Sequence, residues 1–252
     1  MKNYLIITLL LAILHIPGCL APEEESFTHS IDYSISLTLG ELVGEEIRPS
    51  SKIAELENVT LLVPLPAIDG KPVELRDMTI PEGWMVEVVE TPYGVMLKLS
   101  GEKVKTWKMS PMPIPVEVGK TPTVTPTMVK RAVKYEFELR LELEREINTL
   151  DPLSGEYVLQ PKYDLKRVNC SEEYLKHYRY VRCYDYSTMV FYSSYPKLNT
   201  SIYVSLEGRN EWFQMGWTGN EFYDHILAFI TSKGWEEIKG RLETGKGRYL
   251  SK

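Results

Sequence analysis

The sequence predicts an all-β protein: one or two antiparallel β-sandwiches with glycine-rich turns and at most one or two short helices. Three observations support this fold class. Apolar and polar residues alternate with a period of two over residues 31–39 and 135–143. Glycine-containing turn signals recur between short extended runs after residue 200. The alternation of strands and long helices that builds α/β domains does not occur in the pattern.

The N-terminal segment has the features of a secretory signal peptide. Lys2 supplies a positive charge, a largely apolar run extends from Tyr4 to Ile16, and Pro17 and Gly18 end it. The run is shorter than the roughly 20 residues that a membrane-spanning helix needs. We therefore expect residues 1–18 to be a signal peptide.

Ile16-Pro17-Gly18-Cys19 resembles the lipobox of secreted lipoproteins, in which an aliphatic, a variable and a small residue precede a cysteine. The resemblance implies that the Cys19 thiol receives a two-chain lipid and that Cys19 becomes the mature N-terminus. Two lipid chains anchor a protein stably to a membrane. The alternatives are an uncleaved anchor helix with an incidental cysteine, and simple secretion.

Residues 19–29 are expected to be a polar tether, because Glu23-Glu24-Glu25 repel one another and keep the chain extended. Residues 30–252 then form the ectodomain. The formal net charge of the whole chain is -6. An acidic protein of this kind is not a nucleic-acid binder by bulk electrostatics. It is also repelled by anionic head groups, so we expect the lipid anchor alone to provide membrane contact.

The first half of the ectodomain reads as strands separated by turns. The strand at 31–39 is followed by Gly40 and Gly44, which permit turns. Residues 84–90 and 95–99 flank Thr91-Pro92-Tyr93-Gly94 and predict a hairpin. A proline-rich segment then covers 106–129, and it is either a crossover within one sandwich or a linker between domains 30–105 and 130–252.

The cysteines and one polar segment predict local structure in the second half. With Cys19 assigned to the anchor, Cys170 and Cys183 remain as a pair, which in an exported protein indicates a disulfide. Between them, residues 171–178 favour a short helix with Ser171 as the N-cap and acidic residues in the first turn.

The last sixty residues predict a meander. Extended runs at 202–206, 211–217 and 222–230 are separated by turn signals at 207–210 and 218–221. Residues 220–243 also fit helical periodicity, but the recurrent glycines favour strands. The many tyrosines between 174 and 203 indicate sheet packing, with a binding face for carbohydrate or peptide as the alternative.

No catalytic, metal or cofactor motif is recognisable. His225 lies in an apolar stretch and is expected to be a core residue with its hydrogen bonds satisfied. Asp32, Asp185 and Asp224 are spaced carboxylates that would have to converge to form a hydrolase site. Three sequons, at Asn58, Asn169 and Asn199, are candidate glycosylation sites.

These observations predict a lipid-anchored protein on the outer face of a cell membrane. Its expected role is non-enzymatic: a binding or structural module of the envelope, with a glycan or an envelope protein as partner. One alternative is an envelope hydrolase that acts on glycans through a carboxylate pair. Another is the solute-capture subunit of a transporter, which the lack of βα units disfavours.

Overall fold

The computed structural model describes residues 27–44, 46–112, 127–213, 216–231 and 233–249. The expected signal peptide, Cys19, most of the expected tether and residues 113–126 of the proline-rich segment lie outside this range. The described chain is all-β and antiparallel with sandwich-like packing, which confirms the predicted fold class.

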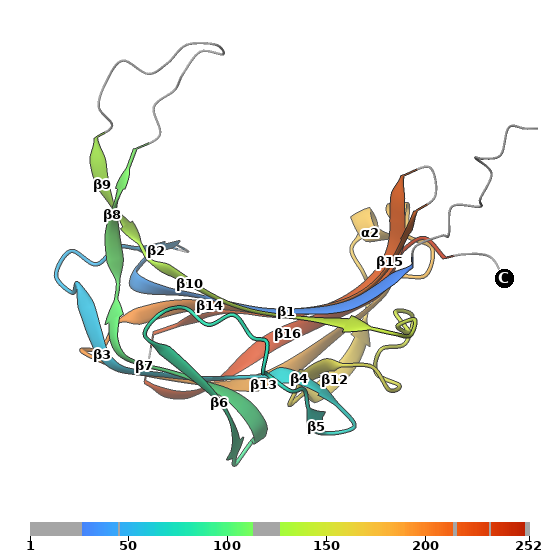
Figure 1. Ribbon diagram of the computed structural model, residues 1–252, viewed down its shortest axis with the longest axis horizontal. Coiled ribbons are helices and arrows are strands. Elements are labelled where there is room, and N and C mark those ends of the chain that lie inside the picture. The colour runs from blue at the N-terminus through green and yellow to red at the C-terminus, as the bar shows by residue number, and fades with distance from the viewer. Residues whose placement is uncertain (1–26, 45, 113–126, 214–215, 232, 250–252) are drawn as a thin grey trace, which may run out of the picture.

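One long sheet curls over on itself and supplies most of the fold (Figure 1). In spatial order its strands are β10 (Lys134–Leu143), β1 (Thr28–Val43), β14 (Asn199–Phe213), β15 (Trp217–Ile230), β16 (Gly234–Gly247), β13 (Arg182–Tyr195), β3 (Glu55–Val63), β7 (Gly94–Lys105) and β6 (Trp84–Thr91). The run from β10 to β16 forms one layer, and β13, β3, β7 and β6 curve beneath it.

Shorter strands and one helix lie at the edges and ends of this sheet. The strands among them are β2 (Glu46–Arg48), β4 (Leu65–Ile68), β5 (Lys71–Pro72), β8 (Trp107–Pro111), β9 (Met128–Ala132), β11 (Val158–Gln160) and β12 (Tyr163–Val168). The helix α2 (Glu172–His177) rises beside β15 at one end, and the β8–β9 hairpin rises at the other (Figure 1). Within the described residues, no helix is long and apolar enough to cross a membrane.

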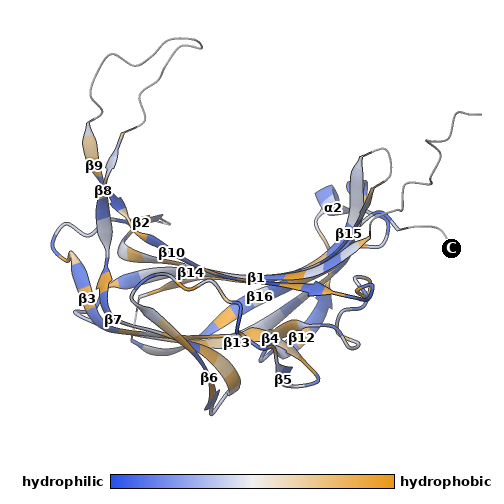
Figure 2. Cartoon of the chain, in the orientation of Figure 1, coloured by the Kyte–Doolittle hydropathy of each residue, from blue (hydrophilic) through white to orange (hydrophobic). Residues whose placement is uncertain are grey.

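The core lies between the two layers. Alternate residues of β1 and β14 point into it, among them Ile31, Tyr33, Val204 and Leu206, because successive side chains of a strand face opposite sides. Trp84 of β6 packs against Tyr135 and Phe137 of β10, which brings the two edges of the curled sheet together. Figure 2 shows hydrophobic and hydrophilic residues mixed along the long strands, as this alternation requires.

Several local predictions are confirmed. Residues 220–243 are strand and turn rather than helix, in β15 and β16. The predicted short helix is α2, whose N-cap Ser171 accepts a hydrogen bond from the backbone N–H of Tyr174. The Cys170–Cys183 disulfide is formed.

The predicted turns at 207–210 and 218–221 are wrong, because both segments lie inside the long strands β14 and β15. Their glycines serve close packing instead of turns. A Cβ on Gly208 would lie 2.0 Å from the ring of Phe222, and one on Gly219 would lie 2.2 Å from the carbonyl oxygen of Asn210. Gly40 is likewise inside β1, where a Cβ would meet the carbonyl oxygen of Arg48 at 2.1 Å.

Strands from both sides of the proline-rich segment share the same sheet. Strand β1 pairs with both β10 and β14, and β3 pairs with β13. The described flanks of the segment pair with each other as the β8–β9 hairpin. This pairing is what a crossover within one sandwich would produce.

Candidate functional site

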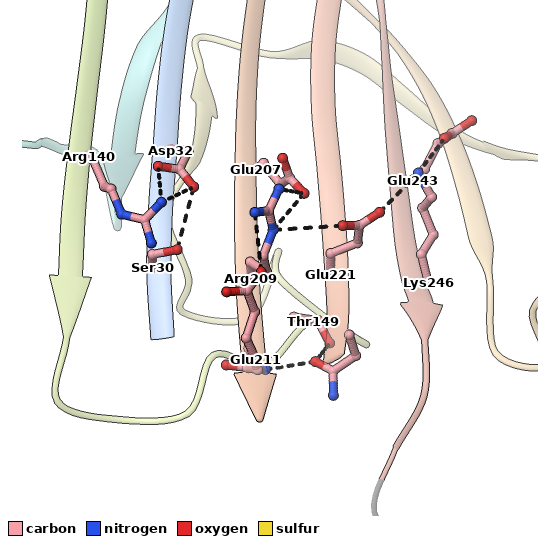
Figure 3. Close-up of polar contacts among 12 residues, drawn as sticks. Ser30, Asp32, Arg140, Thr149, Glu207, Arg209, Glu211, Glu221, Glu243 and Lys246 are labelled. Atoms are coloured by element: carbon pink, nitrogen blue, oxygen red, sulfur yellow. Dashed lines mark hydrogen bonds and ion pairs between the residues drawn. The ribbon is translucent and has the colours of Figure 1, made fainter. Parts of the chain in front are cut away.

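The face of the upper layer that points away from the core carries the candidate site. Along β14 and β15 most of the residues that alternate with the core positions are polar or aromatic. The strand register places Glu207 opposite Tyr223 and Arg209 opposite Glu221. Figure 3 shows the side chains of Glu207, Arg209 and Glu221, which come from these two neighbouring strands. We call this surface the open face.

A guanidinium group holds three carboxylates together on the open face (Figure 3). Arg209 Nη2 lies 2.6 Å from Glu207 Oε1, and Nη1 lies 3.3 Å from Glu211 Oε1. Arg209 Nε lies 4.0 Å from Glu221 Oε2. Burial and a hydrogen bond with Glu221 raise the pKa of the Glu207 carboxyl, although Arg209 opposes this shift. Such a carboxyl can keep a proton at a higher pH than an ordinary glutamate.

A second ionic group on β16 continues this cluster. Lys246 Nζ lies 3.4 Å from Glu221 Oε1 and 3.9 Å from Glu243 Oε2. The pKa of Lys246 is raised. Partial burial alone would lower it, but the carboxylate of Glu221, the hydroxyl of Tyr174 and the carboxylate of Glu243 together have the larger effect. Arg241 bridges Glu243 and Asp185 at 2.9 and 3.3 Å, which extends the charges to β13.

An aromatic and apolar row runs along β14 and β15 next to these charges. The ring of His225 lies 4.8 Å from that of Tyr223 and 6.2 Å from that of Tyr203, and the two tyrosine hydroxyls are hydrogen-bonded to each other. Leu227, opposite Tyr203, is 53% exposed, and Phe229 beyond it is also exposed. An exposed apolar row of this kind commonly marks a binding surface.

The prediction that His225 is a core residue is wrong. Asp224 and Ile226 point into the core. Because successive side chains of a strand face opposite sides, His225 lies on the open face. Burial among the neighbouring rings lowers the pKa of His225. Its Nδ1 is buried without a hydrogen-bond partner in the described structure, so the predicted satisfied histidine is not found either.

Helix α2 forms a wall at the end of the open face. The Cys170–Cys183 disulfide ties the start of the helical segment to β13. Tyr174 is a residue of α2, and its ring lies 5.2 Å from Lys246 Nζ. The same nitrogen lies 5.5 Å from the ring of Tyr223. The disulfide therefore helps to place an aromatic side chain over the charged cluster.

A different ionic cluster lies on the core side of β15 and joins Asp224 to Lys162, which lies between β11 and β12. Lys162 Nζ lies 2.6 Å from Asp224 Oδ2, and the two side chains are 5% and 0% exposed. Tyr186 donates a hydrogen bond to Asp224 Oδ1 at 2.7 Å, and the Leu159 N–H donates to Oδ2 at 2.8 Å. Burial lowers the pKa of Lys162 to about 8 although Asp224 opposes the shift. This cluster is closed off from ligands and is structural.

The spaced carboxylates of the sequence do not form one site. Asp32 and Asp185 lie on the open face, where they pair with Arg140 and Arg241 respectively. Asp224 lies on the opposite side of the sheet. The structure instead brings together Glu207 and Glu221, which sequence reasoning missed because their proximity depends on the β14–β15 register.

The predicted modification sites have separate locations. Asn58 on β3 and Asn169 beside the disulfide are exposed, while Asn199 at the start of β14 is half-buried. Cys19 lies outside the described residues. Within the described chain, no group of three or more His, Cys, Asp or Glu side chains is placed to hold a metal ion.

Buried amides at one end of the sheet join the ends of several strands. Asn210 Nδ2 donates to Asn220 Oδ1 at 2.7 Å, and Thr149 donates to the same oxygen at 2.7 Å. A cavity of about 1390 Å³ adjoins this network.

Comparison with protein-family models, curated proteins and solved structures produced no match.

Proposed function

We propose that this protein is a lipid-anchored module of the outer face of a cell membrane and that it binds a polar ligand, such as a glycan, through its open face. The observation that carries the binding role is the row of aromatic and apolar side chains beside the Glu207–Arg209–Glu221 cluster. The anchor rests on the resemblance of Ile16–Cys19 to a lipobox.

The chemistry of the open face favours a glycan over a charged polymer. Tyrosine rings offer flat apolar surfaces with polar edges, which suit the faces of sugar rings. The carboxylates and Arg209 can exchange hydrogen bonds with hydroxyl groups. Acidic side chains outnumber basic ones along β10, β1, β14 and β15, so a polyanionic ligand would be repelled.

A glycan array probed with the full-length protein tests the binding role. For a glycan that binds, Tyr223→Ala should weaken affinity about tenfold, since losing a stacked aromatic ring costs on the order of 1 kcal/mol. Met85→Ala is the control, because Met85 is an apolar residue on β6, in the other layer, and is 61% exposed. Equal affinity in all three proteins would show that the open face does not bind the ligand.

The anchor is tested separately with Cys19→Ser. Loss of the thiol should release the protein from membranes or leave its precursor unprocessed, as seen by fractionation and by gel mobility. Unchanged membrane retention and unchanged mobility would refute the lipid anchor.

A glycan hydrolase remains the second candidate, and the Glu207–Glu221 pair is what favours it. The raised pKa lets the Glu207 carboxyl act as a general acid. Its hydrogen-bond contact with Glu221 is closer than the roughly 5 Å or more that separates the two carboxyl groups of most glycosidases, so the pair would have to separate to act on a glycan. Product release from a bound glycan, abolished by both Glu207→Gln and Glu221→Gln, would establish the hydrolase. Stable binding without product would favour the binding module.

A further inference from the structure

We infer that the end of the domain next to the tether rests on the lipid surface, with Phe213 at the end of β14 and Trp217 at the start of β15, here called the aromatic tip, in the head-group layer. This inference rests on the proposed lipid anchor and adds a second membrane contact to it. Three features of the described chain support it: exposed aromatic residues, the position of Phe27, and the charges around the end cavity.

Aromatic residues are exposed where β14 ends and β15 begins. Trp217 is 67% exposed and lies 6.1 Å from the ring of Phe213, which is itself exposed. Phe27 is exposed as well, and its ring lies 6.3 Å from that of Trp212 on the same hairpin. Tryptophan and other amphipathic aromatic residues favour the interface between lipid and water. A polar ectodomain has no folding reason to expose these rings together.

The tether places this end close to the bilayer. Phe27 is eight residues after Cys19, and even a fully extended chain of that length spans only about 29 Å. Strand β1, which starts at Thr28, has 16 residues and is therefore about 50 Å long. The β8–β9 hairpin lies at the far end of the sheet (Figure 1) and is not held near the membrane by the tether. The aromatic tip is thus at the end that the anchor restrains.

The end cavity supplies positive charge at the same place. Its wall combines aromatic rings with cations and includes Phe27, Trp212, Tyr249, His177, Arg179 and Arg248. Glu146 also contributes to the wall. Arginine and aromatic side chains together suit the head-group layer, where phosphates accept hydrogen bonds. The whole chain is acidic, which disfavours strong attraction to anionic lipids. We therefore expect that the contact does not need anionic lipids and forms on a zwitterionic bilayer.

Depth-dependent quenching tests the contact. Full-length lipidated protein is reconstituted in phosphatidylcholine vesicles that contain lipids brominated near the head-group end of their chains. Tryptophan fluorescence is compared for the wild type, Trp217→Phe, and the control Trp107→Phe at the β8–β9 end. Trp217→Phe should remove at least half of the bromolipid quenching, and Trp107→Phe should leave it unchanged. The phenylalanine variants keep an aromatic ring and are expected to fold.

The possible failures are distinguishable by flotation. Protein that floats with the vesicles but shows equal bromolipid quenching in all three forms would refute the membrane contact and leave the anchor intact. Protein that does not float would refute the anchor and, with it, this inference. Quenching that disappears in high salt would show that charges, not the aromatic tip, provide the contact.

Discussion

Strand β15 contributes a carboxylate to an ionic cluster on each face of the sheet, Asp224 on the core face and Glu221 on the open face, and the two clusters differ in what surrounds them. On the core face, Lys162 and Asp224 are nearly inaccessible to water and each has further hydrogen bonds. On the open face, Arg209 and Glu221 are each 31% exposed, and Arg209 shares its charge among three carboxylates. Both clusters contain ion pairs as short as 2.6 Å.

The difference shows that distance alone does not assign a role to an ion pair. Removing one partner of a buried ion pair leaves the other charge buried without water or a counter-charge. This strongly destabilises the folded protein. Exposed pairs contribute little to stability because water and salt screen them. The more exposed charges of the open face, Arg209, Glu211 and Glu221, are therefore able to exchange their partners for those of a ligand.

The largest contrast should come from matched amide substitutions. Asp224→Asn leaves Lys162 buried without a counter-charge and should lower the free energy of unfolding by about 3–5 kcal/mol. Glu221→Gln should change it by less than about 1 kcal/mol, because its partners are partly exposed. Urea denaturation followed by circular dichroism measures both. Similar losses in the two variants would remove the distinction between the faces.

The buried lysine should also make stability depend on pH. The pKa of Lys162 is about 8 in the folded protein against an ordinary value of 10.5, so between these values unfolding takes up a proton. Stability should consequently rise with pH from about 8 to 9.5, by up to about 1.4 kcal/mol per pH unit. Lys162→Met should abolish this dependence of the unfolding free energy on pH, even if the substitution also changes the unfolding free energy itself. A wild-type free energy of unfolding that is flat or falls over this range contradicts the assignment.

Gly208 connects the two faces, because it lies between the charged Glu207 and Arg209 while its own position faces the Phe222 ring. Gly208→Ala should cost about 1–3 kcal/mol of unfolding free energy by forcing that ring to move. Combining it with Phe222→Leu should cost less than the sum of the two single changes, since the smaller side chain makes room. Additive losses measured by thermal denaturation would indicate that the two residues do not compete for space.

The smallest effect is expected for Arg209→Gln. Its carboxylate partners are partly exposed to water, and Glu207 can take up a proton, so the free energy of unfolding should change by less than about 1 kcal/mol. Loss of the cation should further raise the pKa of Glu207, because Arg209 is the group that lowers it. NMR titration of the Glu207 side chain gives the direction, and a downward shift would argue against this reading of the cluster.

Local patterns were sufficient to predict much of the fold. Strict alternation in β1 and β10, the Ser171 cap and the two remaining cysteines depend on neighbours in sequence, and all led to correct predictions. The glycines at 208 and 219 misled, because a turn and a tight packing position look alike without knowledge of the residue opposite. Their roles depend on Phe222 and Asn210, which only the strand register brings near.

The candidate site was largely beyond sequence reasoning for the same reason. The alternation of β15 could have shown that Asp224 and His225 face opposite sides, yet the partners Lys162 and Tyr186 come from distant segments. The pairing of Glu207 with Glu221 requires the register across the β14–β15 hairpin. The tyrosines between 174 and 203 were expected mainly to pack, and Tyr186 does so, whereas Tyr203 lies on the open face.

The central claim is that the open face binds a ligand and that its charges are not needed for stability. The most direct measurement pairs glycan affinity with unfolding free energy for Tyr223→Ala and Glu221→Gln. We predict weaker binding in both variants with an unfolding free energy within about 1 kcal/mol of the wild type for Glu221→Gln. Unchanged affinity in folded variants, or binding lost only together with the fold, would contradict the claim.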